Sequence, residues 1–478
     1  MTDCFNLVRP QFIPPLDAEF RPAVLANRSF EAESATVSVP LIFGLERNDE
    51  KRSRFEARIF PEDHPLAEKN LYYAERILKF LLWQRGARKA YVGGPRSVGE
   101  YLLRCYAPGG KRNFDYSFMS DQVYEGAFSV VPCESSQVPP SHDVGEALGR
   151  HLEGCRIGFD LGASDRKVSA VIDGQVVYSE EVIWEPRSHS DPEYHYQEII
   201  TAIKTAASKM PRVDAIGGSS AGIFIENRPM VASLFRGIAP EHYHEIRNLF
   251  LRIRDEMNVP LEVINDGDVT ALAGSMSLED NGILGIAMGS SQAAGYIDMH
   301  GRIMGWLNEL AFAPIDYSPT APLDEWSGDI GCGSQYFSQQ CVFRLADRAG
   351  IQIPDNLPDI EKLNYVQDML QAGHEGAIKI WQSMGIYLGY AIAHYADFYE
   401  MKHVLILGRC TSGLGGTLIM NAARKVLEVE FPDLAARIQV HLPDERSRRV
   451  GQSIAAASLP RVYKLKKEAR RIILKFRS

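Results

Sequence analysis

The chain has 478 residues, of which 45% are hydrophobic and 24% are charged. This composition is typical of a globular protein of about three domains, and it excludes a wholly disordered chain, collagen and a coiled coil. The formal net charge is −9, although residues 461–478 carry eight Lys or Arg against one Glu. The acidic body that remains argues against a general nucleic-acid binder.

Membrane segments and cysteine clusters are not evident. No stretch reaches the roughly 18 apolar residues of a membrane span, and the N-terminus has no pattern of a secretory signal. The seven cysteines are scattered and form no CxxC pair. We therefore expect reduced thiols in a cytoplasmic protein. The basic residues 461–478 have apolar positions near helical spacing, which favours a terminal helix docked on the body over a membrane or nucleic-acid contact.

The first 150 residues predict an accessory α+β domain that is either a lid or an oligomerisation element. Residues 1–30 are rich in proline and predict an extended arm, and residues 132–142 are polar and indicate a linker. The elements expected between them are, in order, a strand over 35–43, helices over 66–85 and 96–106 that flank a strand over 89–92, and one or two strands within 114–131.

Residues 151–460 predict two similar halves, each opening with a hairpin and continuing into alternating helices and strands. The C-terminal helix from residue 450 on is expected to pack on the first half, so that the domains are 1–150, 151–275 and 276–449. The first half is expected to have strands over 155–161, 167–172, 176–183, 213–217 and 261–264, with helices over 192–209, 241–257 and 269–276. The second is expected to have strands over 282–288, 293–298 and 403–407, with helices over 336–348, 375–399, 417–429 and 450–459.

Three turns of small residues carry the chemistry. Asp160 ends an apolar strand directly before Gly162-Ala163-Ser164, and Gly289-Ser290-Ser291 follows the corresponding strand of the second half. Such turns can direct backbone N–H groups at an anion, although a tight hairpin without a ligand would look the same. The loop from Gly408 to Gly416 joins a strand to a helix, where small residues admit a nucleotide to the backbone.

Asp266 ends a further apolar strand, between the first two turns in the sequence. A carboxylate in that place can accept a proton from a substrate hydroxyl, and the neighbouring Asn265 can hold a sugar hydroxyl. The alternative is an Asx turn or a helix N-cap, for which Asp268 is the better candidate because it directly precedes the predicted helix.

These stretches, in this order, resemble the superfamily of sugar kinases, actin and Hsp70 and, within it, the ROK family of bacterial sugar kinases and repressors. The likeness covers about residues 155–460. It implies a two-lobed, actin-like (ribonuclease H-like) α/β fold that binds ATP and Mg²⁺. Asp266 takes the position of the family's catalytic base, Asp160 that of the carboxylate that orients Mg²⁺ through water, and Glu309 that of a sugar-binding glutamate. The nucleotide positions are Gly162, Ala163, Ser164, Gly289, Ser290, Ser291, Gly408, Gly413 and Gly415, and the further sugar positions are Asn265 and Gly222.

The chain departs from the family pattern near these positions. Asp165 stands where the family has a lysine near the phosphates, and Phe312 stands where it has a histidine. The segment corresponding to the family's zinc loop, residues 325–332, keeps one cysteine, Cys332. We therefore expect no structural zinc.

The resemblance leads us to expect an ATP-dependent carbohydrate kinase, acting on a small sugar as a homodimer without nucleic acid or membrane partners. Two alternatives remain open. One is a sugar-sensing regulator or pseudokinase without turnover, and the other is an ATPase of the same fold that acts on a protein. The start of the helix at Arg96 and Ser97 fits either an anion or, preferably, a tight packing turn.

Overall fold

The computed structural model describes residues 5–48, 51–163, 165–443 and 445–462, without the side chains of residues 445–450. Two compact units emerge. The large unit holds the residues up to 146 together with 278–445, and the small unit holds 147–277 and the segment from 446 on. The basic segment predicted to form a terminal helix lies, from residue 463 on, outside the described residues.

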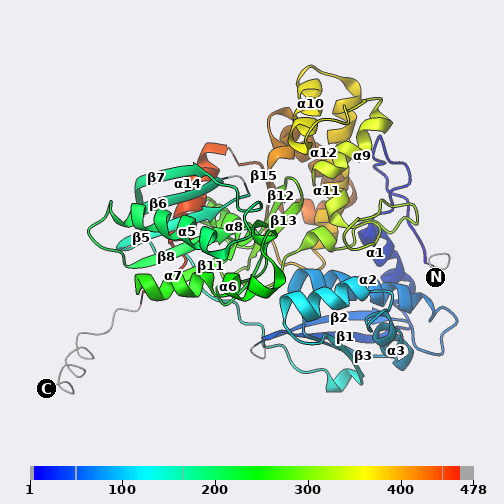
Figure 1. The fold of residues 1–478 in the computed structure, drawn as a ribbon. Coiled ribbons are helices and arrows are strands. Elements are labelled where there is room, and N and C mark those ends of the chain that lie inside the picture. Colours follow the sequence, from blue (N-terminus) through cyan, green and yellow to red (C-terminus); the bar gives the residue numbers. More distant parts are fainter. Residues whose placement is uncertain (1–4, 49–50, 164, 444, 463–478) are drawn as a thin grey trace. The chain divides into compact units, whose positions relative to one another are not determined.

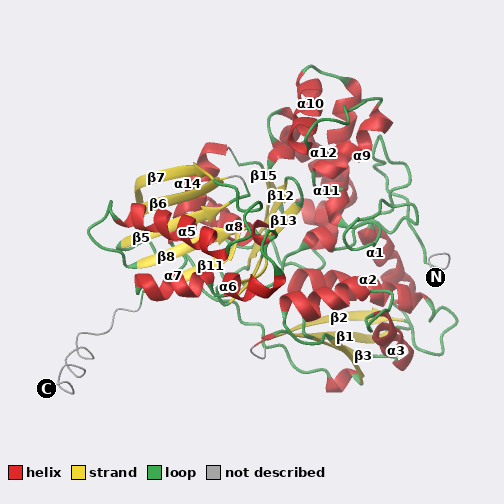
Figure 2. Ribbon diagram, viewed as in Figure 1, coloured by secondary structure: helices red, strands yellow, loops and turns green. Residues whose placement is uncertain are grey.

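The small unit is built on a five-stranded sheet in the order β11-β8-β5-β6-β7 (Figures 1 and 2). Strands β5, β6 and β7 form an antiparallel meander, and β8 and β11 run parallel to β5. The elements are β5 (Cys155–Leu161), β6 (Asp165–Ile172), β7 (Gln175–Ile183), α5 (Pro192–Ala207), β8 (Ala215–Ser220), β9 (Ile223–Ile225), β10 (Arg228–Val231), α6 (Tyr243–Arg247), α7 (Leu249–Met257), β11 (Leu261–Asn265), α8 (Asp266–Leu278) and α14 (Glu445–Ala457).

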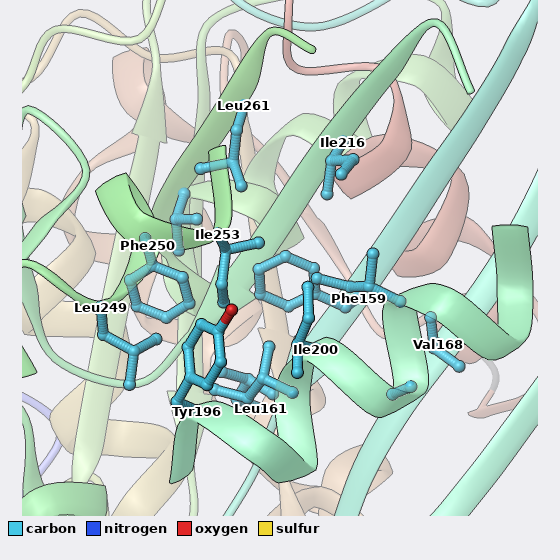
Figure 3. Close-up of a cluster of buried hydrophobic side chains, with 14 of the residues drawn as sticks. Phe159, Leu161, Val168, Tyr196, Ile200, Ile216, Leu249, Phe250, Ile253 and Leu261 are labelled. Atoms are coloured by element: carbon cyan, nitrogen blue, oxygen red, sulfur yellow. The ribbon is translucent and has the colours of Figure 1, made fainter. Parts of the chain in front are cut away.

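One face of this sheet carries the apolar core of the small unit. Side chains alternate along a strand, so Phe159 and Leu161 of β5 share this face, where Ile200 of α5 and Phe250 of α7 cover them (Figure 3). The rings of Phe159 and Phe250 stack with centroids 5.9 Å apart. The carboxylate of Asp160, between these two core residues in the strand, is thereby turned to the opposite face.

Helix α14 lies against that opposite face at van der Waals distance. A Cβ on Gly158 would lie 2.3 Å from the carbonyl oxygen of Ser453, and one on Gly217 would lie 1.7 Å from that of Ala456. Glycine is therefore required at both positions for the helix to approach the sheet. Residues of α14 thus pack on the sheet of the small unit.

The large unit contains a sheet of similar topology, ordered β13-β12-β14-β15. Strand β12 pairs antiparallel with β13 and parallel with β14, as β5 pairs with β6 and β8. The elements are β12 (Ile283–Met288), β13 (Gln292–Ile297), α9 (Gln339–Ala346), α10 (Asp359–Gln371), α11 (Glu375–Tyr395), β14 (His403–Leu407), α12 (Leu414–Glu430), α13 (Pro432–Ala435) and β15 (Gln439–His441). Two such sheets make the duplicated, actin-like α/β fold that the sequence predicts.

The N-terminal part of the large unit has a sheet of its own, ordered β2-β1-β3-β4 (Figure 1). We call residues 39–133 the N-terminal sheet region. Its helix α2 is buried along nearly its whole length. The elements are α1 (Ala23–Ser34), β1 (Val39–Glu46), β2 (Arg52–Ile59), α2 (Lys69–Arg85), β3 (Lys89–Gly93), α3 (Arg96–Cys105), α4 (Asn113–Ser117) and β4 (Ser129–Cys133).

Three local predictions differ from the structure. Residues 23–34 form α1 rather than an extended arm. Of the one or two strands expected within 114–131, β4 begins at Ser129, whereas residues 113–123 form α4 and a turn of π-helix. The helix expected to start after Asp268 starts at Asp266, so Asp268 lies within its first turn and is not its N-cap. Each of these predictions rests on the local sequence pattern, and tertiary packing overrides such local preferences. In the described residues, no helix is long and apolar enough to cross a membrane.

Candidate active site

Two carboxylates lie at the ends of strands in the small unit. Asp160 is the penultimate residue of β5, and Asp266 directly follows the last residue of β11. Strand β8 lies between them, and its Ser219 pairs in register with Asp160 while Ser220 pairs with Asn265. Parallel strands end at one edge of a sheet, which is where ligands bind in open α/β folds.

The environment of Asp266 alters its acidity. Burial raises its pKa to about 6, and the negative charge of Asp160 acts in the same direction, whereas the N–H of Gly267 opposes it. That N–H donates to Asp266 Oδ1 at 3.0 Å. A carboxylate with a pKa just below neutrality is ionised at pH 7 and still basic enough to accept a proton in a transition state.

Asp160 is held by a hydroxyl. Ser219 Oγ donates to Asp160 Oδ1 at 2.7 Å, and Ser219 is fully buried. Carboxylate oxygen is the donor that Mg²⁺ prefers, and this ion usually keeps several waters and takes only one or two protein carboxylates beside substrate phosphates. The donor chemistry of Asp160 therefore fits that ion. In the described part of the chain, no group of three or more His, Cys, Asp or Glu could hold a metal by itself.

The first turn closes on itself next to Asp160. Gly162 N–H donates to the carbonyl of Asp165 at 2.9 Å, and Trp184 Nε1 donates to the carbonyl of Gly162 at 2.8 Å. Ala163 is exposed, and Ser164 lies outside the described residues. The ring nitrogen of a buried tryptophan thus fixes one end of the turn.

A lysine that the motif comparison missed stands beside the turn. Lys167 Nζ lies 3.0 Å from Asp165 Oδ1, and Lys167 pairs in register with Asp160 across β5 and β6. The acid at the family's lysine position is therefore neutralised from two residues further along. The register of β5 and β6 places this cation opposite Asp160.

Asn265 and Gly222 are brought together. Asn265 Nδ2 donates to the carbonyl of Gly222 at 2.7 Å, and Asn265 Oδ1 accepts from Gly267 N–H at 2.7 Å. Gly222 has a φ of 127°, and a Cβ there would lie 2.3 Å from the carbonyl oxygen of Val231. Buried nearby in β8, Ser220 Oγ has no hydrogen-bond partner.

The other predicted site residues belong to the large unit, where two of the loops are neighbours. Gly289, Ser290 and Ser291 form the hairpin turn between β12 and β13, with both serines exposed. Gly408, which has a φ of 101°, touches the backbone of Met288, so that a Cβ there would lie 2.5 Å from the Met288 carbonyl oxygen.

The loop from Gly408 to Gly416 is anchored from α10 and α11. Gln367 Nε2 donates to the carbonyl of Arg409 at 2.7 Å, and Trp381 Nε1 donates to that of Cys410 at 2.8 Å. Gly413 precedes the first residue of α12 and has a φ of 59°, and Gly415 packs against the ring of Trp381. The predicted nucleotide loop is thus a rigid turn at a helix N-terminus.

Glu309 lies in a segment held by the N-terminal sheet region. Its N–H donates to the carbonyl of Trp83 at 2.9 Å. Phe312 packs its ring against that of Trp83 with centroids 4.3 Å apart, so an aromatic contact occupies the predicted histidine position. In the segment 325–332, Cys332 is buried, and burial raises the pKa of its thiol to about 12. At the start of α3, the backbone N–H groups of Arg96 and Ser97 donate to the carboxylate of Glu62, in agreement with a packing turn.

Comparison with known proteins completes this description. A scan against models of protein families finds no match, and a search of curated proteins finds no relative. Among solved structures, the chain is similar to a ROK family glucokinase from Streptomyces griseus in complex with glucose and AMPPNP, at 18% identity and a TM-score of 0.46, over 63% of this chain and 99% of that one. It is similar to a ROK hexokinase from Thermus thermophilus at 16% identity and a TM-score of 0.49, over 63% and 97%.

A ROK family transcriptional regulator, a homologue of the E. coli MLC protein, aligns at 19% identity and a TM-score of 0.49, over 64% of this chain and 79% of that one. The resemblance to ROK proteins that the motifs predict is thus also found among solved structures, which include both kinases and a regulator.

Proposed function

We propose that the protein is an ATP-dependent carbohydrate kinase in which Asp266 is the general base. The observation that carries this proposal is the raised pKa of Asp266, about 6, at the edge of the sheet where Asp160 also ends its strand. A base of that strength at the end of a strand suits the removal of a proton from an alcohol as it attacks a phosphoryl group.

Each residue then has a defined task. Asp160, oriented by Ser219, would hold Mg²⁺ through water. Lys167 would supply the positive charge that the family's lysine provides, since Asp165 stands at that lysine's position. The turn at Gly162 and the turn at Gly289 would bind phosphate oxygens through backbone N–H groups. The loop from Gly408 to Gly415 would hold the adenosine, and Asn265, Gly222 and Glu309 would contact the sugar. Positioning and electrostatics of this kind supply most of the catalysis in phosphoryl transfer.

The test is Asp266→Asn, assayed with a panel of sugars for ATP-dependent phosphorylation. The amide cannot accept the proton, so we expect kcat to fall by about 10²–10⁴-fold, while the affinity for AMPPNP changes little. The matched control is Asp255→Asn, which removes an exposed carboxylate of α7 in the same unit and should leave kcat unchanged. Phosphorylation by Asp266→Asn at the wild-type rate would refute the assignment.

A second candidate is a sugar-sensing regulator without turnover, and one observation favours it. Asp165 places a negative charge within the first phosphate turn, where its carbonyl accepts from Gly162. Two assays of the wild-type protein on the same sugars distinguish the two candidates: calorimetry measures sugar binding, and a coupled ATP assay measures phosphate transfer. Sugar binding with no phosphate transfer to any sugar would favour the regulator.

A further inference from the structure

The loop that follows Glu309 is tied to the N-terminal sheet region by buried ion pairs. Asp329 Oδ2 lies 3.0 Å from Arg76 Nη1 and 3.2 Å from Lys79 Nζ, both on α2. It also lies 2.8 Å from Arg112 Nη1, which directly precedes α4. One carboxylate of the loop thus contacts three cations of a region more than 200 residues away in sequence. We call these four residues and their partners Glu75 and Asp115 the ionic cluster.

The charges of the ionic cluster balance only when Asp329 is included. Glu75 accepts from Arg76 and from Arg112, and Asp115 lies 3.2 Å from Lys79 Nζ. All six side chains are buried. Without Asp329, therefore, three buried cations would face two buried anions, with the half-exposed Lys111 as a further cation on Glu75.

Such a cluster fixes one arrangement of the parts that it joins. A buried charge is tolerated only when opposite charge compensates it, so a shifted loop would leave one positive charge in the interior without compensation. Apolar surfaces, in contrast, can slide while staying buried. Although burial would raise the pKa of Asp329, the charges of Arg76 and Lys79 outweigh it and hold that pKa below its ordinary value, which keeps the carboxylate ionised.

The same helix holds Glu309 directly. Its last turn offers the carbonyls of Trp83 and Gln84, which accept the N–H groups of Glu309 and Asn308, both at 2.9 Å. The indole of Trp83 donates to Asp115 of the ionic cluster at 2.7 Å. Asn308 adopts a left-handed φ of 51°, a conformation that an asparagine tolerates and that turns the chain into the helix end. Helix α2 therefore contacts the loop at two places, at Glu309 and at Asp329.

We infer that α2 and the ionic cluster position Glu309 for the sugar, which makes Asp329 a positioning residue for substrate binding. This inference rests on the proposed function, since it gives Glu309 its meaning. The N-terminal sheet region is then part of the sugar site's framework and acts through the backbone of Glu309. Without this region, the loop that carries Glu309 would lose the contacts that hold it in place.

The experiment compares the full-length wild type with Asp329→Asn and with Asp329→Asn/Arg112→Gln. The single variant leaves one positive charge of the ionic cluster uncompensated, although Arg76, Lys79 and Arg112 each keep one anionic partner. The double variant restores the balance, because the pairs Arg76–Glu75 and Lys79–Asp115 remain, but it does not restore the tie to the loop. We expect the KM for sugar to rise by about tenfold or more in both variants, with the KM for ATP within about twofold of wild type, while the thermal midpoint falls in the single variant and recovers in the double one.

Hydrogen exchange of the Asn308 and Glu309 amides gives a second readout that needs no activity. We expect faster exchange in both variants, and wild-type exchange in the control Glu100→Gln, which removes an exposed pair with Arg96. An unchanged sugar KM in Asp329→Asn, or a KM that recovers together with the thermal midpoint in the double variant, would overturn the inference. If the wild type phosphorylates no sugar, the proposed function fails, but hydrogen exchange still tests whether Asp329 holds the loop. Unaltered protection of the Asn308 and Glu309 amides in the Asp329 variants would refute that role, and lost protection would support it.

Discussion

The two sheets of the actin-like fold share the order of four strands, but different kinds of residue stand at the strand ends. In the small unit, two strand ends carry carboxylates, Asp160 as the penultimate residue of β5 and Asp266 directly after β11. In the large unit, the ends of β12 and β14, which pair as β5 and β8 do, carry glycines and an exposed serine, Gly289, Gly408 and Ser290. One scaffold therefore offers ionisable side chains on one unit and backbone groups on the other.

Under the proposed function, this difference would divide the work between the two units. A group that moves a proton or orients a metal ion must be a side chain of suitable pKa, and burial sets that pKa for Asp266. A group that binds phosphate oxygens can be backbone, because a tight turn aligns several N–H donors without any side chain. We thus expect the small unit to be sensitive to changes of side chain and the turn of the large unit to tolerate them.

The largest effect that tests this contrast comes from Asp160→Asn compared with Ser290→Ala. Loss of the Asp160 charge should misplace the phosphates and lower kcat by about 10²-fold or more. Removing the exposed hydroxyl of Ser290 should change kcat by no more than about twofold, as for an ordinary surface substitution. Steady-state kinetics with ATP and the substrate sugar measure both. Equal losses in the two variants would show that side chains matter alike in both units.

The contrast between the two units could be predicted from the sequence, because it depends on local order. Apolar runs followed by Asp160, Asp266, Gly289 and Gly408 mark the ends of strands, and the structure has strands that end there. Strand boundaries in these stretches were predicted within about two residues, since buried strands with small-residue turns leave a strong local pattern.

Contacts between distant segments could not be predicted in this way. The hydroxyl that donates to Asp160 depends on β8 lying next to β5. The ties of Asp329 cross from a loop to α2. Residues 113–123 have the aromatic content of a strand and fold as helix because Phe114 and Phe118 pack on Trp83. Contacts of this kind depend on tertiary packing, and a local sequence pattern does not show which distant segments pack together.

The pH dependence of the reaction tests the chemistry of the small unit with a smaller effect. Asp266 must be ionised to accept a proton, and its pKa is raised to about 6 by burial and by Asp160. We expect kcat to be constant above pH 7 and to fall by about tenfold for each unit below 6. Rates at saturating ATP and sugar between pH 4.5 and 8, with AMPPNP affinity followed in parallel, give the profile. A rate that stays flat down to pH 5 would exclude Asp266 as the titrating base.

The smallest effect is on stability and has the opposite direction from the loss of activity. Because the folded-state pKa of Asp266 lies above its ordinary value of 3.8, the folded state binds more protons than the unfolded state between about pH 4 and 6, and stability falls as the pH rises through that range. Asp266→Asn removes this penalty. For a half-buried side chain we expect a gain of about 1 kcal/mol at pH 7, or roughly 2–4 °C in the thermal midpoint, which shrinks to nothing below pH 4. Calorimetry of both proteins at pH 4 and 7 measures it. The same burial that raises the pKa of Asp266 therefore costs the fold stability. A variant that is less stable than wild type at pH 7 would mean that Asp266 contributes packing or hydrogen bonds that outweigh its charge.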